Sequence, residues 1–358
     1  MLKLRRGVVV ELDPLTVQVG AERRAAWADV GLVGEVAEGD EVVVNTEAAD
    51  LGLGSGGFDI VHVNLTRGLG NPGGDCSEGV MKLNYTSLQH SVDLVEMPEP
   101  AEPARAGSGS ATAAPVLILP LHGHLAPSVW AAHRTRPEIR VGYVQTHGGS
   151  LPGSLSRDVA ELRERELLAG HLTAGAAYGG EREAISTVGA LDAASRALGW
   201  DAILCGPGPG ILGSATRYGH GGMAALENAH AALALGLPTL VSPRLSSSDP
   251  RPRHRGLSHH TSTVLGLLLA PARVPVPEIE VAGWPTGDEP GADMPSVLDA
   301  LHGACDDRHD VEVEPVDLEE YAASGLPTRT MGRSLADDPL FFAAPLAAGR
   351  ALATAAGV

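Results

Sequence analysis

The chain has 358 residues, of which 44% are hydrophobic and only 3% aromatic, and its formal net charge at pH 7 is −18. This length predicts one large domain or two unequal domains, and an aliphatic core with few aromatic residues favours a parallel sheet covered by helices. The negative charge, without a local basic stripe, argues against polyanionic partners, so we expect binding to neither nucleic acid nor an anionic membrane.

The amino-terminal part of the chain predicts a small all-β domain, a barrel or a sandwich, over residues 1–97. Its Val-rich runs are short, turns separate them, and no substantial helix is expected. The first apolar run is soon interrupted by Glu11, which indicates a strand rather than a signal peptide. The expected strands are residues 7–12, 16–19, 41–45, 59–63, 80–85 and 92–95.

The three cysteines, Cys76, Cys205 and Cys305, lie far apart and show no paired spacing. They predict neither a disulfide framework nor a zinc site, and reduced thiols are typical of a cytoplasmic protein. No apolar run is long enough to cross a bilayer, which favours the same compartment. Residues 98–115 are rich in Pro, Ala, Gly and Ser and predict a flexible linker.

Residues 116–358 predict a Rossmann-like α/β domain with a doubly wound, mostly parallel sheet, because strand and helix patterns alternate there. In the terminal helix, Pro339 is expected in the first turn after Asp338 as cap, and Pro345 is expected to kink it. The expected strands are residues 116–121, 139–145, 172–177, 202–205, 239–241, 272–276 and 311–316. The expected helices are residues 157–169, 184–198, 223–235 and 261–269 and an Ala-rich segment within 335–355.

Five turns rich in Gly, His, Ser and Thr each follow one of these predicted strands, at residues 121–126, 146–156, 178–182, 206–222 and 242–261. The carboxyl ends of parallel strands share one edge of a sheet, and ligands bind in the crevice outside that edge. The sequence therefore predicts that His147, Gly210 and His259 lie on one rim.

The turn at 206–222 matches G-x-G-x-x-G, but a further turn follows before the next helix, which argues against a standard nicotinamide site. Its glycines let backbone N–H groups approach an anion, although they could also serve only the turns themselves. Cys205, at the end of the strand, is interpreted as a small buried hydrophobe rather than a nucleophile. We assign ligand contacts to Gly206, Gly208, Gly210, Gly213, Thr216 and Arg217, and acid/base chemistry to His220.

The turn at 242–261 gathers four arginines and then opens a helix at Ser258. Arginines beside a helix amino terminus predict a receptor for phosphate or carboxylate, with Arg255 and Ser258 as contacts; a solvated basic loop with an ordinary Ser cap is the alternative. His259 or His260 is an acid/base candidate. Adjacent helical residues diverge, so we do not expect these two histidines to share a metal ion.

The remaining turns add further histidines. Thr146, Gly148 and Gly149 are assigned as ligand contacts and His147 as an acid/base candidate. His122 and His124 would share a side in an extended segment and, with His147 or His220, could bind a transition metal. No carboxylate at ligand spacing accompanies them, so no metal ligand is assigned from the sequence.

Six motifs resemble an uncharacterised bacterial family that is catalogued only as a domain of unknown function, number 3866. The motifs are MKLNYTSLQ at 81–89, THGGSLP at 146–152, GPGPGILGSAT at 206–216, YGHGGM at 218–223, SHHTSTVLG at 258–266 and TMGR at 330–333. The resemblance spans nearly the whole chain and implies a whole-chain unit without naming an activity. Arg333, in the last motif, is assigned as an anion contact.

Together these patterns predict that a small anionic metabolite, phosphorylated or nucleotide-like, binds at the carboxyl edge of the sheet. An enzyme built on this site would be a hydrolase or group transferase that uses the four histidines named above as acid/base candidates. A non-catalytic sensor or assembly module is the alternative, and a metal-dependent enzyme is a third. The sequence names no cofactor and leaves a homo-oligomer open.

Overall fold

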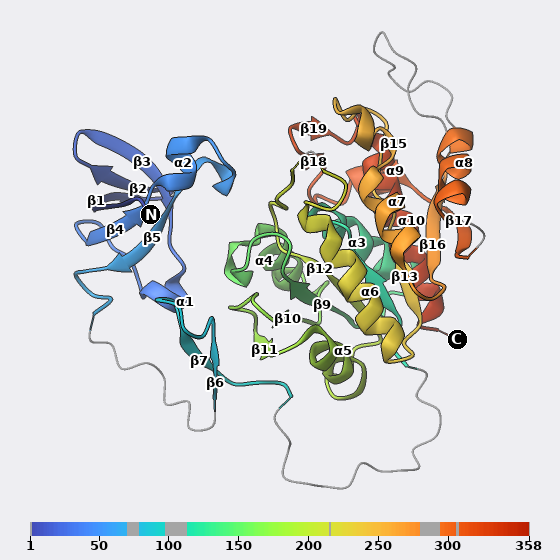
Figure 1. Ribbon diagram of the computed structural model, residues 1–358, viewed down its shortest axis with the longest axis horizontal. Helices are drawn as coiled ribbons and strands as arrows, with labels where there is room; N and C mark the ends of the chain where they lie inside the picture. The colour runs from blue at the N-terminus through green and yellow to red at the C-terminus, as the bar shows by residue number, and fades with distance from the viewer. Residues whose placement is uncertain are drawn as a thin grey trace, which may run out of the picture. The chain divides into compact units, whose positions relative to one another are not determined.

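The computed structural model describes residues 2–69, 79–96, 113–214, 216–279, 294–305 and 308–357. The chain divides into two compact units, Met1–Asp93 and Leu94–Val358, and each is described here by itself (Figure 1). Cys76 and most of the expected linker, residues 98–112, lie outside the described residues.

The amino-terminal unit is built on a closed barrel of five strands in the order β1-β2-β3-β5-β4, which confirms the predicted small β domain. Alternating valines such as Val17, Val42 and Val44 are fully buried in its interior. The strand β3 was not predicted, because its sequence ERRAAW lacks the Val-rich alternation of the others. The strands are β1 (Leu4–Leu12), β2 (Leu15–Val19), β3 (Glu22–Trp27), β4 (Glu41–Asn45) and β5 (Asp59–Asn64).

The other elements of this unit are short. They are α1 (Val30–Val33), α2 (Glu47–Leu51), η1 (Ser55–Gly57), and the antiparallel pair β6 (Val80–Lys82) and β7 (His90–Val92). The strand expected at 80–85 ends early because Leu83 and Tyr85 have φ angles of 47° and 62°, which a strand cannot accommodate.

The second unit contains a parallel sheet of eight strands in the order β11-β10-β9-β12-β8-β13-β16-β17, which confirms the Rossmann-like prediction. Every residue of the central strands is buried, as expected for a sheet that is covered on both faces. The strands are β8 (Val116–Ile118), β9 (Val141–Thr146), β10 (Gly170–Ala174), β11 (Arg182–Ala184), β12 (Ala202–Pro207), β13 (Thr239–Val241), β16 (Arg273–Glu278) and β17 (Asp310–Pro315).

Helices cover both faces of this sheet, and α6 and α7 lie in front of it in Figure 1. One face carries α5 (Thr187–Arg196), α6 (Ala224–Ala234), α7 (His259–Leu267) and α8 (Met294–Cys305). The other carries α3 (Leu125–Thr135), α4 (Arg157–Glu164), α9 (Leu318–Ala322) and most of α10 (Pro339–Ala355). None of the helices in the described ranges combines the length and apolar character that a membrane span requires.

The helices α4, α5 and α6 follow the prediction with shorter ends, α7 begins and ends two residues earlier than predicted, and Pro339 begins α10 as expected. The helices α3 and α8 and the strand β11 were not predicted. The histidines before α3 and Pro127 within it predicted a turn at this place. The helix forms nevertheless, because Pro127 lies in its first turn, where a proline removes no intrahelical hydrogen bond.

The strand order creates a switch point between the neighbouring strands β8 and β12. The helix after β8, α3, packs on one face of the sheet, and the helix after β12, α6, packs on the opposite face. The turns that follow these two strands therefore diverge and leave a crevice at the carboxyl edge, where ligands of such sheets bind.

Candidate functional site

A cavity of about 490 Å³ lies at this switch point, and four segments of the chain line it. They are the turn after β8, the glycine-rich turn after β12, the long turn after β13 with the start of α7, and the hairpin of β18 (Arg329–Thr330) and β19 (Arg333–Ser334). We call this space the arginine cavity. Its lining is Leu121, His122, Gly123, residues 209–214, Arg244, Arg251, Arg253, His254, His260, Arg329, Thr330 and Met331.

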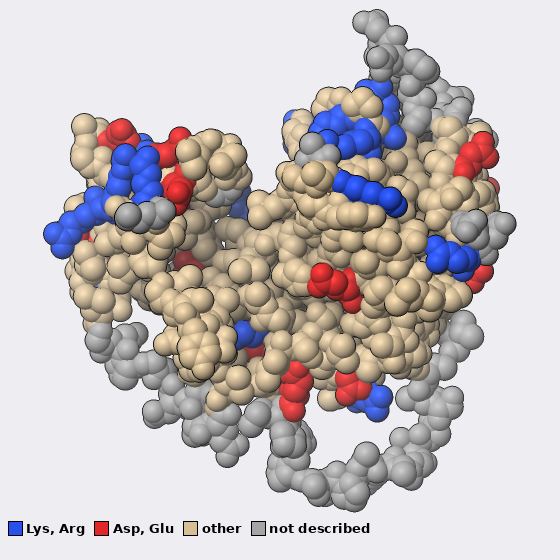
Figure 2. Space-filling model, viewed as in Figure 1, with Lys and Arg blue, Asp and Glu red and all other residues tan. Residues whose placement is uncertain are grey.

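Four arginines line the cavity, and no described lining residue is acidic. Figure 2 shows basic side chains gathered over the end of this unit where Figure 1 labels β15 (Gly256–Leu257), β18 and β19. Arg244 is the buried member of the set, with only 3% of its surface exposed. Burial lowers the pKa of its guanidinium to about 10, so that it still carries its charge at neutral pH.

One fully buried carboxylate, Asp249, orders these arginines. It accepts two hydrogen bonds of 2.9 Å from the Arg251 guanidinium, and the guanidinium groups of Arg244 and Arg333 lie 3.6 and 3.5 Å away. Burial by itself would raise the pKa of Asp249. The hydrogen bonds from Arg251 and the nearby positive charges together have the larger effect and lower this pKa to about 2. One carboxylate faces three guanidinium groups, so the local charge stays positive.

The long turn after β13 is tied down. Its strand β14 (Leu245–Ser246) pairs with β15, and Asp338 at the start of α10 accepts hydrogen bonds from the Ser246 hydroxyl and the Ser247 backbone N–H. Asp338 was expected to cap α10, but its side chain makes no cap hydrogen bond because these groups occupy it. The solvated-loop alternative therefore does not describe residues 244–249.

The glycines of the turn after β12 divide into two groups. A Cβ atom on Gly208 would lie 2.3 Å from the carbonyl oxygen of Ser150, and one on Gly206 would lie 2.7 Å from the Cβ of Leu119, so both serve close packing. Gly210 and Gly213 line the cavity instead, and Gly210 has a φ of 74°. The backbone N–H groups of Gly210, Ile211 and Leu212 donate no hydrogen bond to any described residue.

Beside the cavity, the rings of His220, His259 and His260 meet in one cluster, which we call the histidine cluster. His220 precedes the short helix η4 (Gly221–Met223), while the other two open α7. The rings of His220 and His260 stack with centroids 3.6 Å apart, and the ring of His259 lies 4.4 Å from that of His260. The expected divergence of His259 and His260 is wrong, because side-chain torsions at the first helical residues turn both rings inward.

Two ring nitrogens of the histidine cluster are buried and have no partner among the described residues, namely His220 Nδ1 and His259 Nε2. His220 Nε2 donates to the carbonyl oxygen of Arg217 at 3.1 Å, so in the neutral ring Nδ1 carries a free lone pair. Burial lowers the pKa of His220 and His259 and takes that of His260 to about 2. One ligand atom from each of the three rings lies within 4.8 Å of the others, so the cluster could hold a metal ion.

The turn after β9 lies against the turn after β12. A Cβ atom on Gly149 would lie 2.2 Å from the Gly208 carbonyl oxygen, and one on Gly148 would lie 2.5 Å from that of Gly221. His147 itself is 44% exposed and pairs with Glu227 on α6 at 3.0 Å, away from the histidine cluster. Thus His147, Gly210 and His259 share one edge of the sheet, although the structure does not bring His147 into the cavity lining.

The other predicted contacts lie around this edge without lining the cavity. Thr146 accepts a hydrogen bond from Asn228, Thr216 bonds to the Ser214 hydroxyl, and exposed Arg217 stacks on Tyr218. Arg255 reaches the backbone oxygen of Asp249 at 3.5 Å, Ser258 caps α7, and Arg333 pairs with Asp249 and Asp338.

His122 and His124 do not form the metal pair that their spacing suggested. They lie in the short helix η2 (His122–His124) rather than in an extended segment, so their rings diverge. His122 Nε2 bonds to Ser156 at 2.7 Å, and His124 Nδ1 bonds to Ser242 at 2.8 Å. Neither belongs to the group close enough to share an ion among the described residues.

The sequence reasoning did not assign the residues that carry most of the cavity's charge. Arg244, Arg251 and Arg253 were noticed as a basic turn without being chosen as contacts, and Arg329 was missed. The signal for Arg329 was its position directly before the TMGR motif. Asp249 orders Arg244 and Arg251 from the same turn, and its contact with Arg333 had no signal in the sequence because Arg333 comes from a distant segment.

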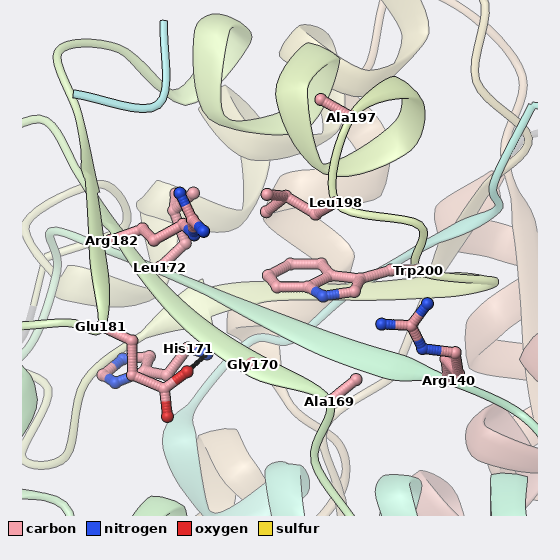
Figure 3. A pocket seen from close by; sticks show the side chains of 10 residues that line it. All are labelled: Arg140, Ala169, Gly170, His171, Leu172, Glu181, Arg182, Ala197, Leu198 and Trp200. Atoms are coloured by element: carbon pink, nitrogen blue, oxygen red, sulfur yellow. Dashed lines mark hydrogen bonds between the residues drawn. The ribbon is translucent and has the colours of Figure 1, made fainter.

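A second cavity, of about 330 Å³, lies at the opposite, amino-terminal edge of the sheet. Trp200 lies along this cavity beside Gly170, with Arg140 and Glu181 at its margins (Figure 3). A Cβ atom on Gly142 would lie 1.9 Å from the indole ring, and one on Gly170 would lie 2.8 Å away, so the two glycines make room for Trp200. We interpret this cavity as a consequence of indole packing rather than as a ligand site.

Comparisons with known proteins give a family but no activity. A family model described as "Protein of unknown function (DUF3866)" matches residues 25–349. Neither the curated proteins nor the solved structures contain a significant match to the chain.

Proposed function

Since the chain belongs to the family described as "Protein of unknown function (DUF3866)", whose description names no activity, we propose a function from the geometry of the arginine cavity. The cavity binds a small anionic metabolite that carries a phosphate group, such as a sugar phosphate or a nucleotide. The observation that carries this proposal is a lining with four arginines and no described acidic residue.

The size of the cavity supports a small molecule. Sites for metabolites and cofactors have volumes of roughly 300–1,000 Å³, and the arginine cavity, at about 490 Å³, falls in this range. A macromolecular polyanion would instead meet the repulsion of a chain with a net charge of −18.

The chemistry of the lining supports a phosphate. Arginine forks donate paired hydrogen bonds to phosphate oxygens, and Arg244 is already oriented by Asp249 before any ligand arrives. The unpaired backbone N–H groups at Gly210, Ile211 and Leu212 add donors of the kind that anion-binding turns provide. His260 contributes a neutral ring to the same wall.

Turnover of the bound anion, by hydrolysis or group transfer, is the second part of the proposal. Three imidazoles line the wall, those of His122, His254 and His260, and one of them would accept a proton from the attacking water or hydroxyl group as general base. Each is a weak base, because burial lowers the pKa of all three rings. The alternative function, a sensor that binds the anion without turnover, is favoured by the weak basicity of these rings. One of them, His122, has a carboxylate nearby, since Asp158 lies 4.0 Å from its Nε2.

Thermal unfolding of the full chain, in the presence of chelator and at constant ionic strength, tests the binding claim. Glucose 6-phosphate is compared with glucose, AMP with adenosine, and inorganic pyrophosphate with sodium chloride. We expect the phosphorylated member of at least one pair to raise the unfolding midpoint and the neutral member to leave it unchanged. Equal shifts within every pair would overturn the proposal. Release of inorganic phosphate, measured with and without added zinc, separates an enzyme from a sensor.

A further inference from the structure

The proposed anion binding involves only His260 of the histidine cluster and gives no role to His220 or His259. We propose that His220, His259 and His260 bind one divalent transition-metal ion, of which zinc fits best, with a coordination position open toward the arginine cavity. This binding does not depend on the proposed function, because the three imidazoles need no anion in order to hold the ion.

The first support is distance and burial. Ligand atoms of the three rings lie within 4.8 Å of one another, and four nitrogens at about 2.0 Å from a tetrahedral zinc would lie about 3.3 Å apart. The ligand atoms must therefore approach one another by up to about 1.5 Å for one ion to bind all three rings. A buried ring nitrogen without a partner destabilises the fold, so His220 Nδ1 and His259 Nε2 require an explanation that a bound ion supplies.

The second support is the hydrogen bond that His220 makes with its other ring nitrogen, Nε2. Metal-binding histidines usually donate their second ring N–H to a carboxylate or a backbone carbonyl, which fixes the tautomer and leaves the other nitrogen free for the ion. His220 Nε2 makes this bond to the Arg217 carbonyl oxygen at 3.1 Å. His254 is a neighbour and not a ligand, because both of its ring nitrogens have partners: Nδ1 bonds to Ser258 at 2.7 Å, and Nε2 accepts from Arg253 at 3.4 Å.

The third support is a glycine that keeps the centre of the cluster open. The Cβ position of Gly222 lies 3.0 Å from His260 Nδ1 and 3.1 Å from His220 Nδ1. Any other residue would place a carbon atom against both nitrogens. Because the Cβ of Gly222 is missing, His220 Nδ1 stays open to an ion, and His260 Nδ1 can become a ligand by exchanging its 3.3 Å hydrogen bond from Arg244 Nη1 for the ion.

The ligand set determines which ions fit. Three imidazoles without carboxylate oxygens suit zinc, copper, nickel or iron and do not suit magnesium or calcium, which prefer oxygen ligands. Zinc with three histidine ligands keeps a fourth position for water or substrate. His260 belongs both to the cluster and to the cavity wall, so this position faces the arginine cavity.

The positive charges around the histidine cluster should make the affinity for the metal ion depend on whether an anion is bound. Arg244 Nη1 lies 3.3 Å from His260 Nδ1, and Arg253 contacts the neighbouring ring of His254 at 3.4 Å. A dication beside these arginines is opposed by Coulomb repulsion, which a bound anion offsets. Each ligand should therefore tighten the binding of the other, by the same factor; this coupling, unlike zinc binding itself, rests on the proposed function.

Zinc loading of the full chain tests the site. Protein stripped with chelator is dialysed against zinc chloride without phosphate, and its metal content is measured by mass spectrometry. We expect about one zinc ion per chain, a higher unfolding midpoint, and loss of both in His220→Ala and His259→Ala. His147→Ala is the matched control, since His147 lies on the same edge outside the cluster, and it should keep the zinc. Cobalt in place of zinc should give the visible absorption of a four-coordinate site.

Two results would overturn the proposal: zinc content far below one ion per chain in the parent protein, or equal zinc content in the parent and both cluster variants. If an alanine variant fails to fold, as judged by circular dichroism, His259→Gln and Gly222→Ala replace it, because they perturb the site with smaller changes in volume. Zinc is measured without anion, and anion binding is measured in chelator, so failure of one proposal is distinguishable from failure of the other.

Discussion

The imidazole rings of His220 and His260 stack face to face, with centroids 3.6 Å apart and an interplanar angle of 7°. Two protonated rings in this arrangement would repel each other, so the stack favours neutral rings. The Nδ1 of His220 has no partner among the described residues, and the Nδ1 of His260 faces Arg244 Nη1 at 3.3 Å. Burial and the charge of Arg244 lower the pKa of both histidines and act in the same direction. The stack therefore presents two nitrogens to the space that Gly222 leaves open.

Gly222→Ala should weaken zinc binding at least 10-fold without unfolding the protein, an order-of-magnitude expectation for crowding two ligand atoms. The new methyl group would lie about 3 Å from both Nδ1 atoms. Gly266→Ala on α7 is the matched control, because a Cβ there meets no atom within 4 Å. Competition with a fluorescent zinc indicator measures both affinities, and equal affinities in the two variants would count against the proposed geometry.

Arg253→Gln and Arg329→Gln should each weaken pyrophosphate binding by about 3- to 10-fold, since each removes an exposed charge from the cavity wall. The effect should shrink as salt is added, because exposed charges are screened. Arg196→Gln is the control, as this side chain is 73% exposed and pairs with Asp192 on α5. Isothermal titration in chelator measures the three affinities; a control variant that weakens binding equally would indicate a general charge effect instead of a site.

Asp249→Asn should destabilise the sheet unit by about 3 kcal/mol, because it leaves the buried Arg244 guanidinium without its carboxylate. Since the pKa of Asp249 in the folded protein is about 2, below its usual 3.8, its contribution is present above about pH 4 and is lost as the pH falls through 2. Urea unfolding followed by circular dichroism measures the change. Asp192→Asn, at an exposed surface pair, should cost little, and a similar cost for both variants would contradict this role of Asp249.

His171→Gln should reduce the loss of stability in mild acid. Burial, together with the charges of His122 and Arg163, lowers the pKa of His171 from 6.5 to about 3. Between these values the unfolded chain binds a proton that the folded chain does not, so stability falls with decreasing pH by up to about 1.4 kcal/mol per pH unit. Urea unfolding at several pH values should show a smaller slope in the variant, whereas His302→Gln, at an exposed position on α8, should keep the parental slope.

Gly142→Ala should destabilise the protein by about 1–3 kcal/mol or more, because its Cβ would overlap the indole of Trp200. Trp200→Leu makes room at the same place and should reduce the cost of the glycine substitution. The double-mutant cycle isolates this coupling. Thermal unfolding of the four proteins gives the coupling energy, and strictly additive effects would show that a side chain at position 142 and the Trp200 indole do not compete for the same space.

Much of the fold followed from local patterns in the sequence. Strands such as β9 and β12 are mostly apolar runs with His147 or Gly208 directly after them, and both features belong to the chain segment itself. Because all eight strands run in parallel, the prediction that their turns share an edge required no knowledge of side-chain contacts. The pattern failed where local signals conflict with packing, as in the charged strand β3.

The tertiary structure decided which residues form the site. His147 and His220 follow neighbouring strands and looked equivalent in sequence, yet His147 pairs with Glu227 while His220 stacks on His260. Likewise, Asp249 and Arg333 come from distant segments and meet at 3.5 Å. The sequence determined which strands end in polar turns, because periodicity and turn chemistry are properties of a short segment. Only the packed structure decided which side chains face one another, because side-chain torsions respond to neighbours that the chain brings together from afar.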